Sequence, residues 1–409
     1  MMKRLLFILI TLIYFSCGVT ARERTDSAAP DGGPLVVSLI TCAPGPDVYE
    51  LCGHAAIRIR NSEMDSVWNY GIFDFSSPNF LYRFVKGETD YMVRGYDFAR
   101  FMPAYVMRGS EVLEQTLDLS QDEALKLRSL LSTEALPENR VYRYNYVRDN
   151  CATRPWRRVM EAAPSIALPD TLLFPTFRKE MRRFHRNYPW YQFGIDLVLG
   201  SGLDYPLERD EDIFAPPVLA AKVARATIGE GADGDSVRGR RPLVAETSVV
   251  YPGRGDVTLP PTSPFLTPMA AGIVTLIISF GALFACILKK SVWRWWISLY
   301  FAIAGVAGCI VAFLVFCSEH EAVRPNILIL WLNPLQFVVA VGIWLESARR
   351  LLGIAAWYEI IIAILIPVLS LTGIFPQYLN AATYPFLLSL IPLGVILKIN
   401  KTKKISITK

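Results

Sequence analysis

The chain has 409 residues, of which 52% are hydrophobic and only 19% are charged. A soluble domain usually carries about 25% charged residues, so this composition excludes an ordinary water-soluble protein. The formal net charge is +5, and no run of five like charges forms the basic stripe typical of a nucleic-acid-binding protein. The sequence therefore predicts a membrane protein with a polar region attached.

The N-terminus has the pattern of a secretory signal peptide. Lys3 and Arg4 precede an apolar run from Leu5 to Phe15, which is shorter than the roughly 20 residues that span a bilayer. Small residues follow, so we expect a signal peptide over residues 1–21. An uncleaved anchor and a lipoprotein-type processing site at Cys17 are the alternatives.

Residues 35–226 have the composition of a globular α+β domain. Residues 35–41 are rich in β-branched side chains, which predicts a strand. From His54 to Arg60 apolar and polar residues alternate, and a polar turn and residues 66–73 follow. This pattern predicts a β-hairpin.

Two helix starts can be recognised in this domain. Ser120 and Glu123 form a capping box, which predicts a helix from residue 123 onwards. Asp149 and Asn150 favour the N-cap position, so Cys151 is expected in the first turn of the next helix. A helix N-terminus lowers the pKa of a thiol and stabilises an oxyanion. Cys151 is therefore the candidate nucleophile.

A nucleophilic cysteine needs a histidine to form an ion pair and a third polar group to orient that histidine. His54 is one of two histidines in the domain, and Asn69 lies on the neighbouring strand of the predicted hairpin. Cys151, His54 and Asn69 are thus the candidate catalytic residues. The alternative is that Cys151 is a small buried residue without chemistry.

The rest of the chain divides into a linker and a membrane domain. Residues 227–263 are rich in Gly, Asp, Arg and Pro without periodicity, which predicts a linker. Residues 264–409 contain five apolar stretches of the length that crosses a bilayer. They cover about residues 265–288, 295–317, 327–345, 355–373 and 380–398.

The basic residues between these stretches predict the orientation. They follow the first, third and fifth stretches and comprise Lys289, Lys290, Arg294, Arg349, Arg350 and the lysines from Lys398 to Lys409. Basic loops stay in the cytoplasm, so we expect a cytoplasmic C-terminus and a periplasmic polar domain on the inner membrane.

Several short motifs surround the candidate residues. They are Thr41-Cys42-Ala43-Pro44-Gly45, Gly53-His54-Ala55-Ala56-Ile57-Arg58, Asn69-Tyr70-Gly71-Ile72-Phe73-Asp74-Phe75, Asp149-Asn150-Cys151-Ala152-Thr153-Arg154 and Gly194-Ile195-Asp196-Leu197. Together they resemble the Lnb family of bacterial lipoprotein N-acyltransferases. The order of His54 before Cys151 also resembles the permuted papain-like fold of lecithin:retinol acyltransferase, of which NlpC-type peptidases are the unpermuted form. The resemblance implies an α+β permuted papain-like domain followed by an all-α membrane domain of five helices.

The resemblance also implies a reaction. Cys151 would take an acyl chain from a phospholipid as a thioester and pass it to the α-amino group of the diacylglyceryl-cysteine of a lipoprotein. His54 would act as base and then acid, and Asn69 would orient it. The permuted relatives have a histidine at the position of Asn69, so Asp74 is the alternative third member. The implied partners are a phospholipid donor, diacylglyceryl lipoproteins and membrane lipids, without a metal, a cofactor or a nucleic acid.

Other interpretations stay open at this point. A membrane-tethered NlpC-like cysteine peptidase or amidase acting on cell-wall peptides would use the same dyad, although it would need only a tether. A non-enzymatic membrane scaffold would make Cys151 dispensable. Cys42 and Cys52 would form either a disulfide in an oxidising compartment or two packed thiols.

Overall fold

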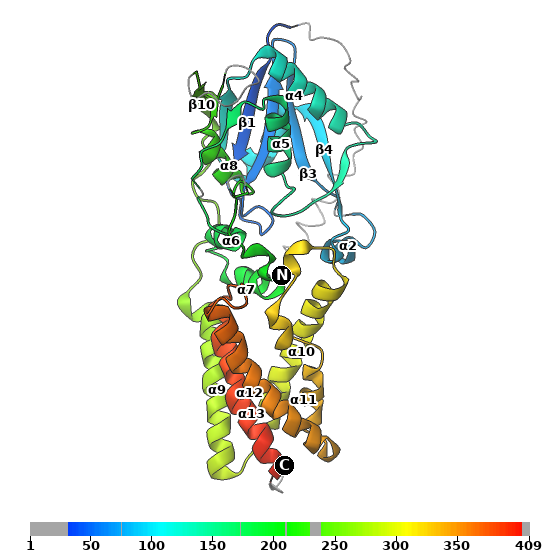
Figure 1. Cartoon of the computed structure of the whole chain (residues 1–409), viewed down its shortest axis with the longest axis vertical. Helices are drawn as coiled ribbons and strands as arrows, with labels where there is room; N and C mark the ends of the chain where they lie inside the picture. The colour runs from blue at the N-terminus through cyan, green and yellow to red at the C-terminus, as the bar shows by residue number, and fades with distance from the viewer. Residues whose placement is uncertain (1–31, 75, 172, 209–210, 230–238, 403–409) are drawn as a thin grey trace. The chain divides into compact units, whose positions relative to one another are not determined.

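The computed structural model describes residues 32–402, apart from residues 75, 172, 209–210 and 230–238. The predicted signal peptide, residues 1–21, lies outside the described residues. From Pro34 onwards the chain forms one compact unit. A sheet-rich domain comes first in this unit, and long helices follow it (Figure 1).

The first domain is built on a seven-stranded antiparallel sheet. Its strands lie in the order β10-β5-β1-β2-β3-β4-β6. Their bounds are β1 Val36–Cys42, β2 His54–Arg60, β3 Asp65–Ile72, β4 Asp90–Asp97, β5 Val112–Leu117, β6 Val141–Arg143 and β10 Val244–Tyr251. The predicted hairpin is confirmed, because β2 pairs with β3 and places Ala56 opposite Asn69.

Both faces of the central strands are buried. Leu39 of β1 faces a core that includes Leu127 and Trp156 from the helices α4 (Gln121–Glu134) and α5 (Thr153–Ala162), which cover this face in Figure 1. The next residue, Ile40, faces a second core with α3 (Phe98–Arg108). Successive side chains of a strand point to opposite faces, so an apolar run such as β1 is buried on both.

The helix α4 is predicted by its capping box, and it begins at Gln121, two residues earlier than expected. The Ser120 hydroxyl accepts a hydrogen bond from the backbone N–H of Glu123, and the Glu123 carboxylate accepts one from the N–H of Ser120 at 2.8 Å. Both halves of the capping box are therefore present. The other elements of the domain are α2 Phe80–Lys86, α6 Phe177–Phe184, α7 Pro189–Val198, η1 Ser201–Leu203 and α8 Pro216–Val223.

The segment predicted as a linker, residues 227–263, contains strands instead. β8 (Thr227–Ile228) and β9 (Arg241–Pro242) pair with β7 (Ile166–Ala167) in a small second sheet. β10 then adds to the edge of the large sheet, with Val244 opposite Leu117. The prediction was wrong because it rested on the flanking Gly and Asp residues. It overlooked the β-branched residues of β10, which favour a strand.

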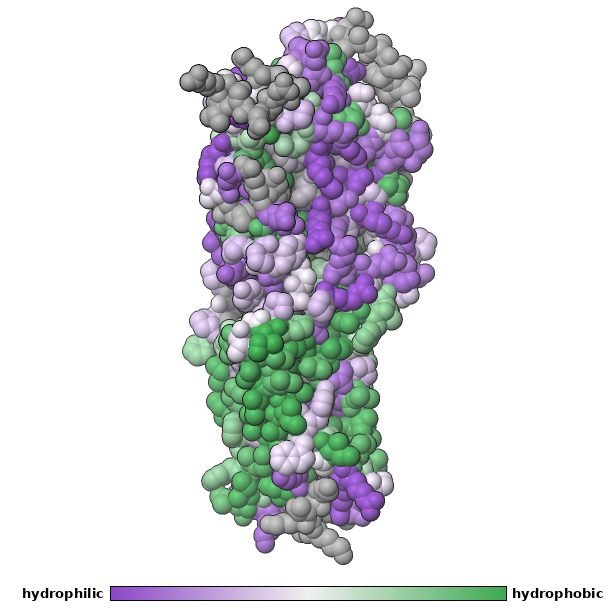
Figure 2. Space-filling model, viewed as in Figure 1, coloured by the Kyte–Doolittle hydropathy of each residue, from purple (hydrophilic) through white to green (hydrophobic). Residues whose placement is uncertain are grey.

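Four helices of the second domain are long and apolar enough to cross a membrane, as far as the described residues extend. They are α9 Pro268–Lys289, α10 Arg294–Cys317, α12 Arg349–Leu371 and α13 Thr383–Thr402. These helices match the first, second, fourth and fifth predicted stretches. Hydrophobic side chains cover the lower part of the face drawn in Figure 2, where these helices lie, and hydrophilic side chains dominate over the sheet domain.

The third predicted stretch, residues 327–345, is not a continuous helix. It contains only the 3₁₀ turn η4 (Ile327–Leu330) and the seven-residue helix α11 (Gln336–Gly342). Asn333 and Pro334 separate the two, and the Asn333 amide donates to the carbonyl of Leu330 at 3.1 Å. Proline cannot donate a backbone hydrogen bond, so the apolar composition alone overestimated this helix. Within the described residues four of the five predicted membrane helices are therefore present as continuous helices, and the third is not confirmed.

The sheet domain is joined to the membrane domain through backbone and buried polar contacts. The N–H of Gly200 donates to the Ala322 carbonyl, and the N–H of Ser201 donates to the Pro325 carbonyl, both at 2.8 Å. Asp196, from the Gly-Ile-Asp-Leu motif, is buried and accepts hydrogen bonds from Arg178 at 2.7 Å and from the Asn380 amide at 2.8 Å. These contacts fix the domain above the helices.

Candidate active site

Cys151 lies in the turn that leads into α5. The Asn150 side-chain oxygen accepts hydrogen bonds from the N–H groups of Ala152, the N-cap residue of α5, at 2.8 Å and of Thr153, its first residue, at 3.0 Å. The Asn150 amide nitrogen donates to the Phe214 carbonyl at 2.8 Å. The thiol therefore lies just before a helix N-terminus and not in the first turn of the helix, where the sequence predicted it, and the residue is only 7% exposed.

His54 and Asn69 come from adjacent strands of the sheet. His54 opens β2, and its Nε2 lies 2.6 Å from the side-chain oxygen of Asn69 on β3. The Asn69 amide nitrogen donates to the Tyr96 hydroxyl at 2.7 Å, which leaves the oxygen of the amide facing the imidazole. Nε2 then carries the proton, and Nδ1 is the ring nitrogen left for the thiol.

The structure brings the side chains of Cys151 and His54 within hydrogen-bond distance of each other. Burial disfavours the thiolate, but the charge of His54 and hydrogen bonds from His54, from the Ala55 N–H and from Tyr144 outweigh it and lower the pKa of the Cys151 thiol. Burial also disfavours the imidazolium, but Cys151 and Asn69 outweigh this and raise the pKa of His54. Each charge thus stabilises the other.

Tyr144 is a site residue that the sequence did not predict. Its hydroxyl hydrogen-bonds to Cys151, and burial raises its pKa well above the ordinary value, so it stays protonated and donates. Its ring stacks on Tyr91 with centroids 4.4 Å apart. Gly71 has a φ of +85° and leaves room for this arrangement, because a Cβ there would lie 3.3 Å from the Tyr144 ring.

Asp74 does not reach His54. β3 ends at Ile72, and the exposed Asp74 carboxylate accepts hydrogen bonds from the N–H of Ser76 at 2.8 Å and from its hydroxyl at 2.6 Å. These bonds lower the pKa of Asp74. The structure therefore places Asn69, and not Asp74, beside the imidazole.

Cys42 and Cys52 are free thiols in the structure. Cys42 is fully buried in β1, directly opposite His54 in the register, and burial raises its pKa. The Cys52 sulfur lies 3.2 Å from the Tyr146 hydroxyl. The structure therefore agrees with two packed thiols and not with a disulfide between Cys42 and Cys52. Within the described residues no cluster of three or more His, Cys, Asp or Glu side chains is arranged to hold a metal ion.

The fold and the site define a class of protein: a membrane protein whose sheet-rich outer domain carries a buried cysteine–histidine pair. Residues 23–183 match the model of the Lnb N-terminal periplasmic domain, and residues 261–404 match the model of the Lnb transmembrane domain. The chain belongs to the Lnb family of lipoprotein N-acyltransferases, which confirms the resemblance seen in the motifs. A periplasmic domain joined to a transmembrane domain makes it an inner-membrane protein. Comparison with the curated proteins and with the solved structures found no match.

Proposed function

We propose that this protein moves an acyl chain from a phospholipid, through a thioester on Cys151, to the α-amino group of a lipoprotein's diacylglyceryl-cysteine. The observation that carries the proposal is the hydrogen-bonded Cys151–His54 pair, in which the pKa of the thiol is lowered and that of the imidazole is raised. The pair lies in a domain joined to helices that are long and apolar enough to cross a membrane. A thiolate next to an imidazolium is a strong nucleophile at neutral pH. Membership of the Lnb family supports the same assignment of substrates.

The first half of the reaction acylates the enzyme. The Cys151 thiolate attacks the ester carbonyl carbon, and a carbon–sulfur bond forms. When the tetrahedral intermediate collapses, the carbon–oxygen bond breaks, and the alcohol of the lysophospholipid takes the proton from the His54 imidazolium. The Tyr144 hydroxyl, which bonds the sulfur at rest, is then a donor for the developing oxyanion.

The second half transfers the chain to the amine. The α-amino nitrogen attacks the thioester carbonyl, and neutral His54 accepts the proton that the nitrogen loses. The carbon–sulfur bond breaks and restores the thiolate–imidazolium pair. Asn69 is the positioning residue in both halves, because its bond to Nε2 keeps Nδ1 directed at the reacting atoms.

Burial of the thiol suits a thioester enzyme. A thioester in open water would be lost to hydrolysis, whereas Cys151 is only 7% exposed. Both substrates are anchored in the bilayer, so a site fixed to membrane helices can reach them without dissociating. A cell-wall peptidase would need only a tether.

We extend the proposal to the fold and to the topology. Along the chain, His54 on β2 comes first, the strands β3 to β5 of the same antiparallel sheet follow, and Cys151 comes later, just before α5. This order supports a permuted papain-like arrangement. Lys289 ends α9 and Lys290 follows it, and Arg349 and Arg350 open α12, which supports a cytoplasmic side for these ends and for the C-terminus.

The test is mass spectrometry of lipoprotein N-terminal peptides from cells that lack the protein. The proposal predicts that lipoproteins keep a free α-amino group in these cells and regain the N-acyl chain when the gene is restored. Unchanged N-acylation in the deletion strain would refute the proposal. A change in cell-wall peptides without a change in lipoproteins would favour the peptidase.

A further inference from the structure

The short helix α2 presents an apolar face that the protein does not cover. None of its seven residues is buried. Leu81 is 72% exposed, Tyr82 55% and Phe84 45%. A contiguous set of large apolar side chains left in water is unfavourable, so such a face marks a contact with lipid or with a partner.

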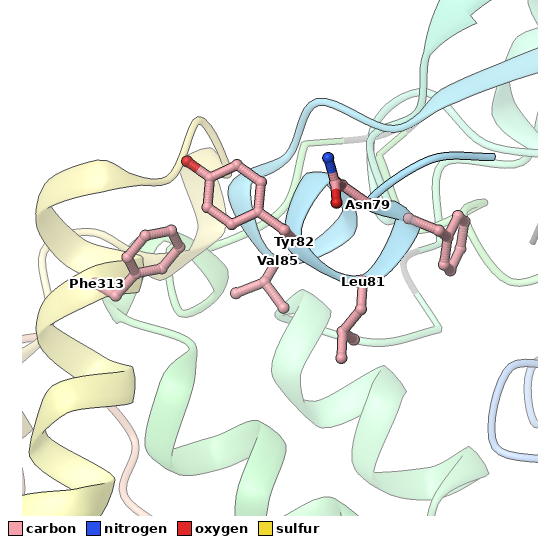
Figure 3. A pocket seen from close by; sticks show the side chains of 6 residues that line it. Asn79, Leu81, Tyr82, Val85 and Phe313 are labelled. Carbon is pink, nitrogen blue, oxygen red and sulfur yellow. The ribbon is translucent and has the colours of Figure 1, made fainter.

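The face of α2 is continuous with a membrane helix. Tyr82 packs against Phe313 of α10, with ring centroids 6.0 Å apart. An apolar groove is lined by α2 and Phe313, and Figure 3 shows Tyr82 and Phe313 turned towards each other while Leu81 points away from the helix. One wall of the groove is thus part of α10, a helix that is long and apolar enough to cross a membrane.

The loop that follows α10 holds α2 in this position. The Glu319 N–H donates to the Lys86 carbonyl at 2.8 Å, and a ring nitrogen of His320 lies 2.9 Å from the Phe84 carbonyl. Gly87 ends α2 with a φ of +85°, and a Cβ there would lie 3.2 Å from the His320 nitrogen. The groove is thus a fixed part of the fold.

A row of aromatic rings runs from α2 to the thiol. The successive centroid distances are 6.0 Å for Phe84–Phe80, 5.8 Å for Phe80–Phe73, 5.0 Å for Phe73–Tyr91 and 4.4 Å for Tyr91–Tyr144. The row ends at Tyr144, whose hydroxyl hydrogen-bonds to Cys151. Successive ring contacts therefore link Phe80, which lines the groove, with the tyrosine that hydrogen-bonds to the sulfur.

We propose that the α2–Phe313 groove and this aromatic row hold the acyl chain of the donor phospholipid while the chain is attached to Cys151. The inference rests on the proposed function and adds the binding site of the chain. A chain that leaves the bilayer for a thiol in the outer domain would otherwise expose its methylene groups to water. The groove lets it stay in apolar contact between the membrane and the sulfur.

Photocrosslinking tests the position of the chain. The full-length protein is placed in phosphatidylethanolamine vesicles whose palmitoyl chains carry a terminal diazirine, and it is irradiated before any lipopeptide is added. We expect acyl-Cys151 whose chain is crosslinked to the peptide Phe80–Lys86 or to the peptide with Phe313. Crosslinks confined to other peptides would overturn the inference and leave the proposed function intact. Absence of acyl-Cys151 would overturn both. Crosslinks to α2 only from a diazirine-bearing diacylglyceryl lipopeptide would assign the groove to the acceptor.

A matched pair of substitutions tests whether the groove matters. Leu81→Lys puts a charge on the exposed face of α2, whereas Leu125→Lys does the same on an exposed leucine of α4. Leu81→Lys should slow acylation of Cys151 from the vesicles at least tenfold, and Leu125→Lys should change it less than twofold. Alkylation of Cys151 by iodoacetamide reports whether the site is folded in each variant. Equal acylation rates in the two variants would overturn the inference.

Discussion

Cys151 and Cys52 each lie beside a tyrosine hydroxyl, yet the pKa of the Cys151 thiol is lowered and the pKa of the Cys52 thiol is raised. Burial raises the pKa of Cys52 to about 12, and its hydrogen bond with Tyr146 does not compensate. The pKa of Cys151 is lowered despite burial, because His54 adds a positive charge. Exposure does not explain the difference, since Cys52 is the more accessible of the two. The histidine therefore decides which thiol can react.

The largest expected difference in activity is between the variants that lack one of the two thiols. Cys151→Ala should abolish N-acylation, a loss of about 10³-fold or more, because no thioester can form. Cys52→Ala should retain activity within a few-fold. The measurement is mass spectrometry of lipoprotein N-termini in complemented deletion cells. N-acylation that persists in Cys151→Ala would rule out the mechanism.

Removing the imidazole should raise the pKa of the Cys151 thiol, as burial raises that of Cys52. In the wild type the thiol pKa is lowered, so the alkylation rate should rise with pH at values below those of an ordinary thiol. In His54→Ala the same rise should move to higher pH, and acyl transfer should fall about 10²–10⁴-fold because the general base and acid is lost. Iodoacetamide labelling of Cys151 from pH 5 to pH 10 checks the shift. Superimposable profiles for the two proteins would contradict the ion pair.

The third position is tested by Asn69→Ala against Asp74→Asn. Asn69 only orients the ring, so its loss should slow acyl transfer about 10–10³-fold, with the effect in kcat. Asp74 binds Ser76 in an exposed turn, and its amide variant should be nearly silent. Turnover of a diacylglyceryl lipopeptide in proteoliposomes gives both values. A damaging Asp74→Asn with a silent Asn69→Ala would reverse the assignment.

The smallest expected difference is between substitutions of Tyr144 and of Tyr146. Tyr144→Phe removes one donor to the Cys151 thiolate, and a hydrogen bond to a charged group is worth about 1.5–3 kcal/mol. We expect the rise of the Cys151 alkylation rate with pH to move up by about one pH unit, since one pKa unit corresponds to about 1.4 kcal/mol. Tyr146→Phe removes the partner of Cys52 and should leave this pH dependence unchanged. If both variants show the wild-type pH dependence, Tyr144 does not stabilise the thiolate.

Local patterns were enough to predict the parts of the site that depend on neighbouring residues. The alternation after His54 predicted the strand and its hairpin partner, and Asn150 predicted a helix start close to Cys151, although α5 begins only at Thr153. The Cys151–His54 proximity needs tertiary structure, but the chemistry of a cysteine nucleophile already required a histidine nearby.

The features that were missed depend on packing between distant segments. Tyr144 reaches the sulfur only because the chain beyond β6 lies beside Gly71 and Tyr91. β10 is a strand because β5 offers an open edge. Average hydropathy over residues 327–345 did not register the break at Asn333 and Pro334. None of these contacts leaves a periodic signal in the sequence.

The central claim is that Cys151 carries the acyl chain, and the most direct measurement is to trap this intermediate. The full-length protein in phosphatidylethanolamine vesicles, without a lipoprotein acceptor, is quenched in acid and digested, and the peptide with Cys151 is analysed by mass spectrometry. We predict a hydroxylamine-sensitive acyl group on Cys151 that disappears when a diacylglyceryl lipopeptide is added and is absent in His54→Ala. An unmodified Cys151 peptide during active N-acylation, or an acyl group on another residue, would contradict the account.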